Sequence, residues 1–244
     1  MAEADILHLL QNGRLEIEGL LPWSSNYTFL VQVCGEDGEL PAVYKPRRGE
    51  RPLWDFPQGT LCVRERAAFV VSAALGWALT PPTVLRDGPH GLGSVQLFIE
   101  HDPERHYFTF EGQPDYAAQL QQIVLFDILI NNADRKGGHV LLEQKDGEPD
   151  HLWAIDHGVC FHTDPKLRTV IWEFAGQPAP PDLLADLQRF QEDMAVDNGR
   201  LRTQLIELLS VQEVTTLLYR LRDLLQTGLF PQPGPGRHYP WPPV

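Results

Sequence analysis

The sequence has few features of secreted, membrane-embedded or nucleic-acid-binding proteins. Its 244 residues include only three scattered cysteines, a pattern typical of free thiols in a reducing compartment. No run approaches the roughly 20 apolar residues that span a bilayer, and the first residues are acidic, unlike a secretory signal. The net charge of −13 disfavours nucleic acid and anionic membranes as partners. We therefore expect a cytoplasmic protein with no nucleic-acid partner and no stable membrane association.

Several common catalytic motifs are also missing. The chain contains no Walker-type Gly-x-x-x-x-Gly-Lys-Ser/Thr string and no Gly-x-Ser-x-Gly elbow. The histidines between residues 139 and 162 match no His-rich zinc signature. The composition, with 43% hydrophobic and 22% charged residues, is ordinary for a globular chain with a real core. The length fits one large domain or two closely packed lobes.

The apolar pattern changes from strands to helices along the chain. Alternating β-branched and aromatic residues predict strands, and spacing of three to four residues predicts helices. The expected helices are 5–12, 61–77 and 115–130, with two or three more between 182 and 226; the expected strands are 14–19, 27–34, 40–45, 94–99 and a hairpin within 140–155.

This order predicts an α+β fold with two lobes around a cleft. We expect a strand-rich N-lobe at 1–99 and a helical C-lobe at 100–227. The last 17 residues, 228–244, hold six prolines and three glycines and are expected to be extended or disordered, since proline fits neither a helix interior nor an inner strand. A cleft between two walls suits phosphoryl transfer, which depends on positioning and charge neutralisation.

The densest group of polar side chains follows the helix expected at 115–130. Residues 127–139 hold two acids, two amides, two bases and a histidine, and Asp156 follows a second apolar run. Each feature alone is typical of a turn. Together they suggest a kinase, because Mg²⁺ is usually held by one or two carboxylates plus the nucleotide phosphates. Asp156 is then the expected metal ligand, and Asp134 is expected to accept or orient the proton of the attacking hydroxyl.

Two charged residues earlier in the chain extend this hypothesis. Lys45 ends an expected strand and would neutralise the α- and β-phosphates. Glu65 lies on the following helix and would pair with Lys45 to fix its head group. Lysines on strands and glutamates on helices are more often simply solvated. The order Lys, Glu, Asp, Asp along the chain is that of kinases, and it favours the functional interpretation.

Four short segments carry a family resemblance. They are ERAAF at 65–69, GSVQLFIE at 93–100, DILINNADR at 127–135 and AIDHG at 154–158. In this order they resemble the lysine-partner helix, hinge, catalytic loop and metal-binding turn of the phosphatidylinositol 3- and 4-kinase superfamily, especially its type II phosphatidylinositol 4-kinase branch. The chain also resembles an uncharacterised actinobacterial family placed in that superfamily.

The resemblance implies roles for the matched residues. The hinge would meet the adenine of ATP, and the catalytic loop would be held in place around Asp134. The implied hinge residues are Gln96, Leu97, Phe98 and Ile99, and the implied loop residues are Asp127, Asn132 and Arg135.

The sequence departs from the family pattern in two places that bear on the site. The glycine-rich phosphate loop is replaced by a stretch with Ser24, Ser25 and Asn26, whose backbone N–H groups could cover phosphates, although a plain hairpin loop is nearly as compatible. His139 stands where the relatives usually place an asparagine metal ligand. Imidazole suits softer metals than magnesium, so His139 favours Mn²⁺, lies behind the metal ligands, or marks weakened catalysis.

The function expected from these features is ATP-dependent phosphorylation, with Mg²⁺ or Mn²⁺, of a hydroxyl on a soluble small molecule or a protein. An inositol- or polyol-type acceptor rests on superfamily analogy alone. A nucleotide-binding pseudokinase or scaffold, and an enzyme that transfers AMP, are the alternatives. The sequence does not distinguish these outcomes, because the acceptor surface is built from variable loops.

Overall fold

An antiparallel five-stranded sheet forms the first part of the chain. The computed structural model describes residues 1–21, 26–36 and 38–244. The strand order is β1-β2-β3-β5-β4. The strands are β1 (Arg14–Leu20), β2 (Phe29–Gly35), β3 (Gly38–Pro46), β4 (Thr83–Gly88) and β5 (Gly91–Leu97).

One face of this sheet is covered by helix α1 (Glu3–Asn12), which packs on β2, β4 and β5. Alternate residues of a strand point to opposite faces. On β3, Ala42 and Tyr44 therefore join a small buried core with Leu10 of α1. Their neighbours on the strand, Val43 and Lys45, turn to the other face and line a cleft.

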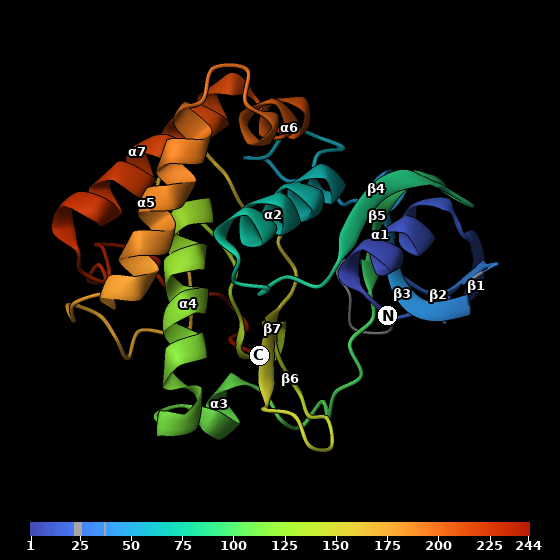
Figure 1. Ribbon diagram of the computed structural model, residues 1–244, viewed down its shortest axis with the longest axis horizontal. Coiled ribbons are helices and arrows are strands. Elements are labelled where there is room, and N and C mark those ends of the chain that lie inside the picture. Colours follow the sequence, from blue (N-terminus) through green and yellow to red (C-terminus); the bar gives the residue numbers. More distant parts are fainter. Residues whose placement is uncertain (22–25, 37) are drawn as a thin grey trace.

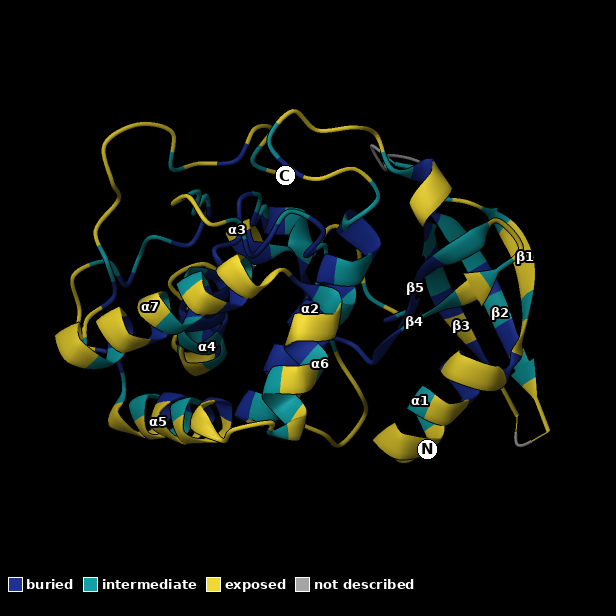
Figure 2. Cartoon of the chain, turned by 90° about the horizontal axis from the view of Figure 1, so that it is seen from above, coloured by how far each residue is buried: buried dark blue, intermediate teal, exposed yellow. Residues whose placement is uncertain are grey.

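The second part of the chain is mainly helical (Figure 1). Helix α4 runs through its centre, and most of its positions are buried because the helix is apolar nearly all round. Figure 2 shows the exposed outer side of α5 beside this buried centre. The elements are α3 (Tyr107–Phe110), α4 (Pro114–Ile130), the 3₁₀ turn η2 (Gly137–His139), the hairpin β6 (Val140–Glu143) and β7 (His151–Ala154), α5 (Pro181–Ala195), α6 (Arg200–Leu208) and α7 (Val211–Thr227).

Helix α2 (Leu61–Leu75) lies between the sheet and the helical part (Figure 1) and packs on β4, β5, α5 and α6. The carboxylate of Glu50 accepts the N–H groups of Leu61 (3.1 Å) and Cys62 (2.8 Å) and so caps this helix. Two consecutive residues of α2 connect the two parts of the chain. Arg64 forms an ion pair with Glu213 of the helical part, and Glu65 forms one with Lys45 of the sheet.

The expected two-lobed α+β fold is confirmed, with differences in its elements. Strand β4 was not expected, and it forms because β5 offers an edge with which residues 83–88 pair. The strand expected at 94–99 runs from Gly91 and ends at Leu97, so Phe98 and Ile99 lie beyond it. The lobe boundary at residue 99 stays a prediction. Among the described residues, no helix combines the length and the hydrophobicity that crossing a bilayer requires.

The proline-rich tail 228–244 contains no helix or strand, as expected, but it is built into the helical part. Phe230 is buried and its ring lies against Phe174, with the centroids 5.7 Å apart. Leu229 forms an isolated antiparallel bridge with Pro178. The end of the described chain lies beside the β6–β7 hairpin (Figure 1).

We expect Arg64→Met to lower the free energy of unfolding by about 3–5 kcal/mol, because it leaves a carboxylate without its buried partner. The Arg64 guanidinium lies 2.5 Å from Glu213 of α7 and donates to the Cys160 carbonyl at 2.6 Å, with its side chain 2% exposed. Urea unfolding followed by circular dichroism measures the change. The control is Arg189→Met, whose pair with Asp186 is exposed and should contribute at most about 1 kcal/mol. Equal losses in the two variants would show that Arg64 is not an anchor.

Candidate active site

The cleft between the sheet and the β6–β7 hairpin has a volume of about 440 Å³. Both halves of the chain supply its walls. Among the described residues, its lining comes from the sheet side, from the segment after β5 and from the catalytic-loop side: Leu21, Thr28, Val43, Lys45, Gln96, Leu97, Phe98, Ile99, His101, Gly138, His139, Leu141, Ile155 and Asp156.

Lys45 lies at the centre of the charged groups in this cleft. Its Nζ is 2.5 Å from Glu65 Oε1 and 3.0 Å from Asp156 Oδ1. The second oxygen of Glu65 accepts the N–H of His157 at 2.9 Å. The ion pair predicted between Lys45 and Glu65 is therefore confirmed, and Glu65 also holds the turn that carries Asp156.

The charge states follow from these contacts. Burial alone would lower the pKa of Lys45, but the charges of Asp156 and Glu65 raise it above its ordinary value. The positive charge of Lys45 holds the pKa of Asp156 well below its usual range. Lys45 is thus cationic and Asp156 anionic at neutral pH. Asp156 also has a left-handed backbone conformation, with φ of 62°, which is uncommon for a residue other than glycine and is found at functional sites.

Strand β3 approaches β5 closely after Lys45 because residue 93 of β5 is a glycine. Gly93 faces Pro46 in the β3–β5 ladder. A Cβ at Gly93 would lie 2.5 Å from the Lys45 carbonyl oxygen, closer than the two atoms can approach. The glycine in the GSVQLFIE segment therefore permits the strand spacing that places Lys45.

Asp127 and Arg135 form a fully buried ion pair beneath the catalytic loop, and both side chains are 0% exposed. Arg135 Nε donates to Asp127 Oδ2 at 2.8 Å and its Nη2 to Oδ1 at 2.9 Å. Asn132 donates its amide to Asp127 Oδ1, and its own Oδ1 accepts the N–H of Asp134. Asp127, Asn132 and Arg135, expected among the catalytic residues, therefore lie behind the site and fix the loop.

Asp134 is the loop carboxylate that reaches the surface. Its side chain is 33% exposed, and Lys136 Nζ lies 3.7 Å away. Burial raises the pKa of Asp134 to about 6, and the nearby charge of Asp156 contributes to the rise. At neutral pH the carboxylate is ionised, and it binds a proton more readily than an ordinary aspartate does.

His139 lies beside Asp156 on the β6–β7 side of the cleft, with Nε2 3.3 Å from Oδ2. Burial lowers the pKa of His139 to about 4, so the ring is neutral at pH 7. Its Nδ1 lies 2.9 Å from the Asp134 carbonyl oxygen, and we assign the proton to Nδ1 because a carbonyl only accepts. The lone pair of Nε2 is then directed at a carboxylate oxygen. Two such atoms fit a cation between them.

This donor pair fits a divalent ion held partly by a nucleotide. Among the described residues, no group of three His, Cys, Asp or Glu side chains is arranged to hold a metal by itself. Kinase metals use one or two protein ligands and complete their coordination with phosphate oxygens. His139 and Asp156 match that smaller requirement.

The hinge residues expected at 96–99 line the cleft, but some of their backbone N–H groups already donate within the protein and cannot bind a ligand. The N–H of Leu97 donates to the Pro82 carbonyl at 2.9 Å, and that of Phe98 to the Pro41 carbonyl at 3.0 Å. The Gln96 side chain donates to Thr83 Oγ1 at 2.8 Å. Among the described hydrogen bonds, none uses the N–H of Ile99. The Ile99 N–H is therefore available to a ligand in the cleft, and its contact with adenine stays a prediction.

The expected phosphate-loop residues lie mostly outside the described part. Ser24 and Ser25 are not among the described residues. The Asn26 side chain accepts the N–H of Arg51 at 2.8 Å, and it is not among the described residues that line the cleft. Asn26 as a cofactor contact stays a prediction. Thr28 lines the cleft instead.

The sequence interpretation missed several apolar lining residues, for which weak signals existed. Val43 stands two residues before Lys45 and so shares its strand face. Leu141 and Ile155 come from the expected hairpin; Leu141 is two residues after His139, and Ile155 directly precedes Asp156. Leu21 lies at the edge of the stretch expected to replace the phosphate loop.

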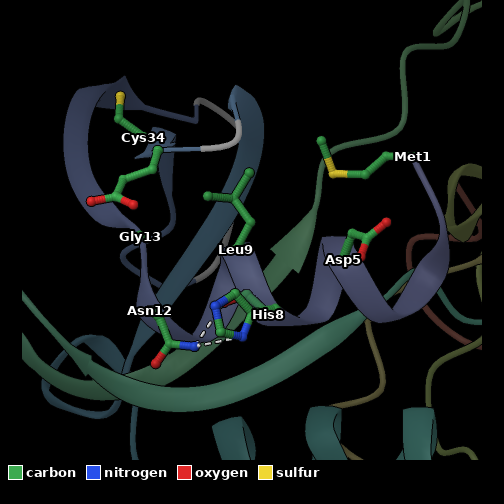
Figure 3. A pocket seen from close by; sticks show the side chains of 9 residues that line it. Met1, Asp5, His8, Leu9, Asn12, Gly13 and Cys34 are labelled. Carbon is green, nitrogen blue, oxygen red and sulfur yellow. Dashed lines mark hydrogen bonds between the residues drawn. The ribbon is translucent and has the colours of Figure 1, made fainter.

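A larger cavity lies elsewhere in the described part, between α1 and the β2–β3 end of the sheet (Figure 3), with about 640 Å³. It is bordered by Asp5, His8, Asn12 and Cys34. His8 and Asn12 bond to each other (3.2 Å) within α1. No converging set of charged groups like that around Lys45 is present among these residues, so the smaller cleft is the candidate active site.

The fold and this cleft define a two-lobed kinase of the atypical type. The chain belongs to the phosphatidylinositol 3- and 4-kinase family, whose model matches residues 87–226. It is 36% identical over 96% of its length, and 94% of the relative's, to Protein Rv2133c of Mycobacterium tuberculosis. It is 30% identical to phosphatidylinositol 4-kinase gamma 4 of Oryza sativa over 55% of this chain, which spans only 27% of that protein.

Solved structures support the same fold. The Golgi casein kinase with Mn and ADP bound has a TM-score of 0.62 at 16% identity and covers 92% of this chain and 74% of its own. The Helicobacter pylori proinflammatory kinase CtkA has a TM-score of 0.55 at 11% identity, with 91% and 94% covered. These structures confirm the predicted fold, and the family model confirms the superfamily predicted from the four segments.

The buried and the exposed aspartates of the loop should differ in their effect on stability. Asp127→Asn leaves the Arg135 guanidinium without a charged partner, and we expect it to lower the free energy of unfolding by about 3–5 kcal/mol. Asp134→Asn, at the partly exposed position, should stay within about 0.5 kcal/mol of the wild type. Urea unfolding compares the two. If Asp127→Asn proves as stable as Asp134→Asn, the buried pair does not anchor the loop.

Proposed function

We propose that the protein is an ATP-dependent phosphotransferase that phosphorylates a hydroxyl group of a soluble small molecule or a protein. The observation that best supports this proposal is that one lysine contacts two carboxylates from different parts of the chain. Lys45 contacts both Glu65 and Asp156. Lys45 and Asp156 line the cleft, and Asp134 lies near enough for the charge of Asp156 to affect its pKa.

Each residue is given a physical role in this proposal. Lys45 binds the α- and β-phosphates as a cation, and Glu65 keeps its head group in place when the phosphates arrive. Ile99 donates its N–H to the adenine edge, while Val43 and Leu141 pack on the base. His139 and Asp156 hold Mg²⁺ or Mn²⁺, which neutralises phosphate charge when bound. Asp134 orients the acceptor hydroxyl and accepts its proton.

The relatives suggest two classes of acceptor. Their names indicate a phosphatidylinositol lipid for the plant proteins and casein for the Golgi kinase. Inositol and other polyols are the soluble compounds that share the hydroxyl chemistry of the first class. The net charge of −13 favours an acceptor that does not have to be bound at an anionic bilayer surface.

Asp156 should make nucleotide binding depend on metal. We expect wild-type affinity for ATP, measured by calorimetry, to rise when Mg²⁺ or Mn²⁺ replaces EDTA. In Asp156→Ala this gain should shrink at least tenfold, because a carboxylate bound to a cation contributes more than 1.4 kcal/mol. Asp164→Ala, an exposed acid of the following loop, is the control. Equal metal dependence in Asp156→Ala and wild type would remove the metal assignment.

Asp134 should be needed for turnover and not for nucleotide affinity. The protein is incubated with γ-labelled and, separately, α-labelled ATP, with either metal, and with polyol, phosphatidylinositol and protein acceptors. We expect γ-label transfer by the wild type and a loss of about 10²–10⁴-fold in Asp134→Asn, the usual contribution of a positioned acid or base.

Other outcomes identify the alternatives. Transfer of the α-label would show AMP transfer, and nucleotide binding without transfer of either label to any acceptor would show a pseudokinase. An Asp134→Asn variant that transfers the γ-label as fast as the wild type would refute the role of Asp134 even if the chain is a kinase.

A further inference from the structure

The proline-rich tail ends against the catalytic loop. The N–H of Gly137 donates to the Pro243 carbonyl at 2.8 Å. Gly137 is the first residue of η2, and it lies between Lys136 and the pair Gly138 and His139 that lines the cleft. The backbone that connects Asp134 to His139 is therefore bound to a segment more than one hundred residues further along the chain.

A second contact of the tail acts through an intermediate segment. Residues 168–170 pair with the catalytic loop through the parallel bridge between Arg135 and Thr169. In that pairing the Arg168 N–H donates to the Asn132 carbonyl at 2.9 Å, and the Arg135 N–H donates to the Arg168 carbonyl at 2.9 Å. The outer side of the segment is bound by the tail, since the Thr169 N–H donates to the His238 carbonyl at 3.1 Å.

The His238 carbonyl receives a further donor. Trp172 Nε1 lies 3.3 Å from it, and the indole and imidazole rings meet edge to face with centroids 6.0 Å apart. Pro240, between the two contact points of the tail, is buried. The tail thus holds the loop from two directions, directly at Gly137 and through residues 168–170.

The space around Gly137 shows how close this packing is. A Cβ at this position would lie 2.9 Å from the Phe108 ring and 3.5 Å from the Pro243 carbonyl oxygen. Two consecutive glycines, Gly137 and Gly138, give the loop more backbone freedom than other residues would. A hydrogen bond to the first of them removes freedom at the place where the loop turns toward His139.

We propose that residues 237–243, the tail strap, are positioning residues of the active site. The carbonyls of His238 and Pro243 hold the catalytic loop in the conformation that directs Asp134 and His139 to the cleft. The effect on catalysis rests on the proposed function, whereas the effect on loop conformation does not.

The first test measures the loop itself. A chain that ends at residue 236 lacks the strap but keeps Phe230 and its contacts. We expect amide hydrogen exchange in residues 133–140 to become about tenfold faster or more, since the bonds that hold this backbone are lost. Exchange in α4 should stay within about twofold. Unchanged exchange in 133–140, or equal acceleration in α4, would overturn the proposal, the latter by showing general loosening. This result is independent of whether the protein is an active kinase.

The second test measures turnover. If the wild type transfers phosphate, the shortened chain should lose at least about tenfold in kcat, while the KM for ATP changes less than about threefold. Trp172→Phe keeps an aromatic ring at this position but removes the Nε1 donor, and it should show a smaller loss in kcat. Pro235→Ala changes an exposed tail residue and serves as the control with wild-type kinetics. A rise in KM for ATP with unchanged kcat in the shortened chain would contradict a role in positioning Asp134.

Discussion

The buried pair of Asp127 and Arg135 is the contact on which the site depends. A guanidinium has five donor hydrogens in a planar arrangement, and here they reach three separate segments. Two N–H groups bind Asp127 at the end of α4, and Nη1 donates to the carbonyls of His139 (3.0 Å) and Ile155 (2.8 Å). Because a buried charge without partners is very costly, these segments stay together while the protein is folded. The catalytic loop, η2 and the turn of Asp156 thus share one fixed centre.

The charged groups in the cleft are held from the opposite side by Glu65. One of its oxygens binds Lys45 of the sheet, and the other binds the N–H of His157. Helix α2 carries Glu65 and is itself anchored in the helical part by Arg64, whose guanidinium contacts Glu213 and the Cys160 carbonyl. The position of the Lys45 head group is therefore linked to the helical core, although Lys45 lies on the sheet. A movement of α2 would shift Lys45 relative to Asp156.

The sequence allowed prediction of those parts that depend on local pattern and on motif order. Lys45 was predicted at the end of a strand, and the order from Lys45 to Asp156 indicated the kinase arrangement. Strand β4 was not predicted, because its apolar residues Val84 and Leu85 are adjacent and do not alternate with polar ones, although β4 and β5 form a local hairpin in which Gly88 pairs with Gly91. The contacts of the tail were not predictable for a different reason. They are made by the carbonyls of His238 and Pro243, and any residue has a carbonyl, so residue type carries no signal of such a contact.

His139 shows how one loop conformation determines two chemical features. A neutral imidazole offers a lone pair to a metal, as an asparagine oxygen also can, from the ring nitrogen that bears no proton. The Asp134 carbonyl accepts a hydrogen bond from Nδ1 of His139 at 2.9 Å, and this bond directs Nε2 to Asp156. Asp134, whose side chain is the proposed acceptor of the hydroxyl proton, thus also orients His139, the proposed metal ligand, through its backbone. A loop displaced by a fraction of a hydrogen-bond length would misplace both groups together, which explains why Arg135 and residues 168–170 both bind this short stretch.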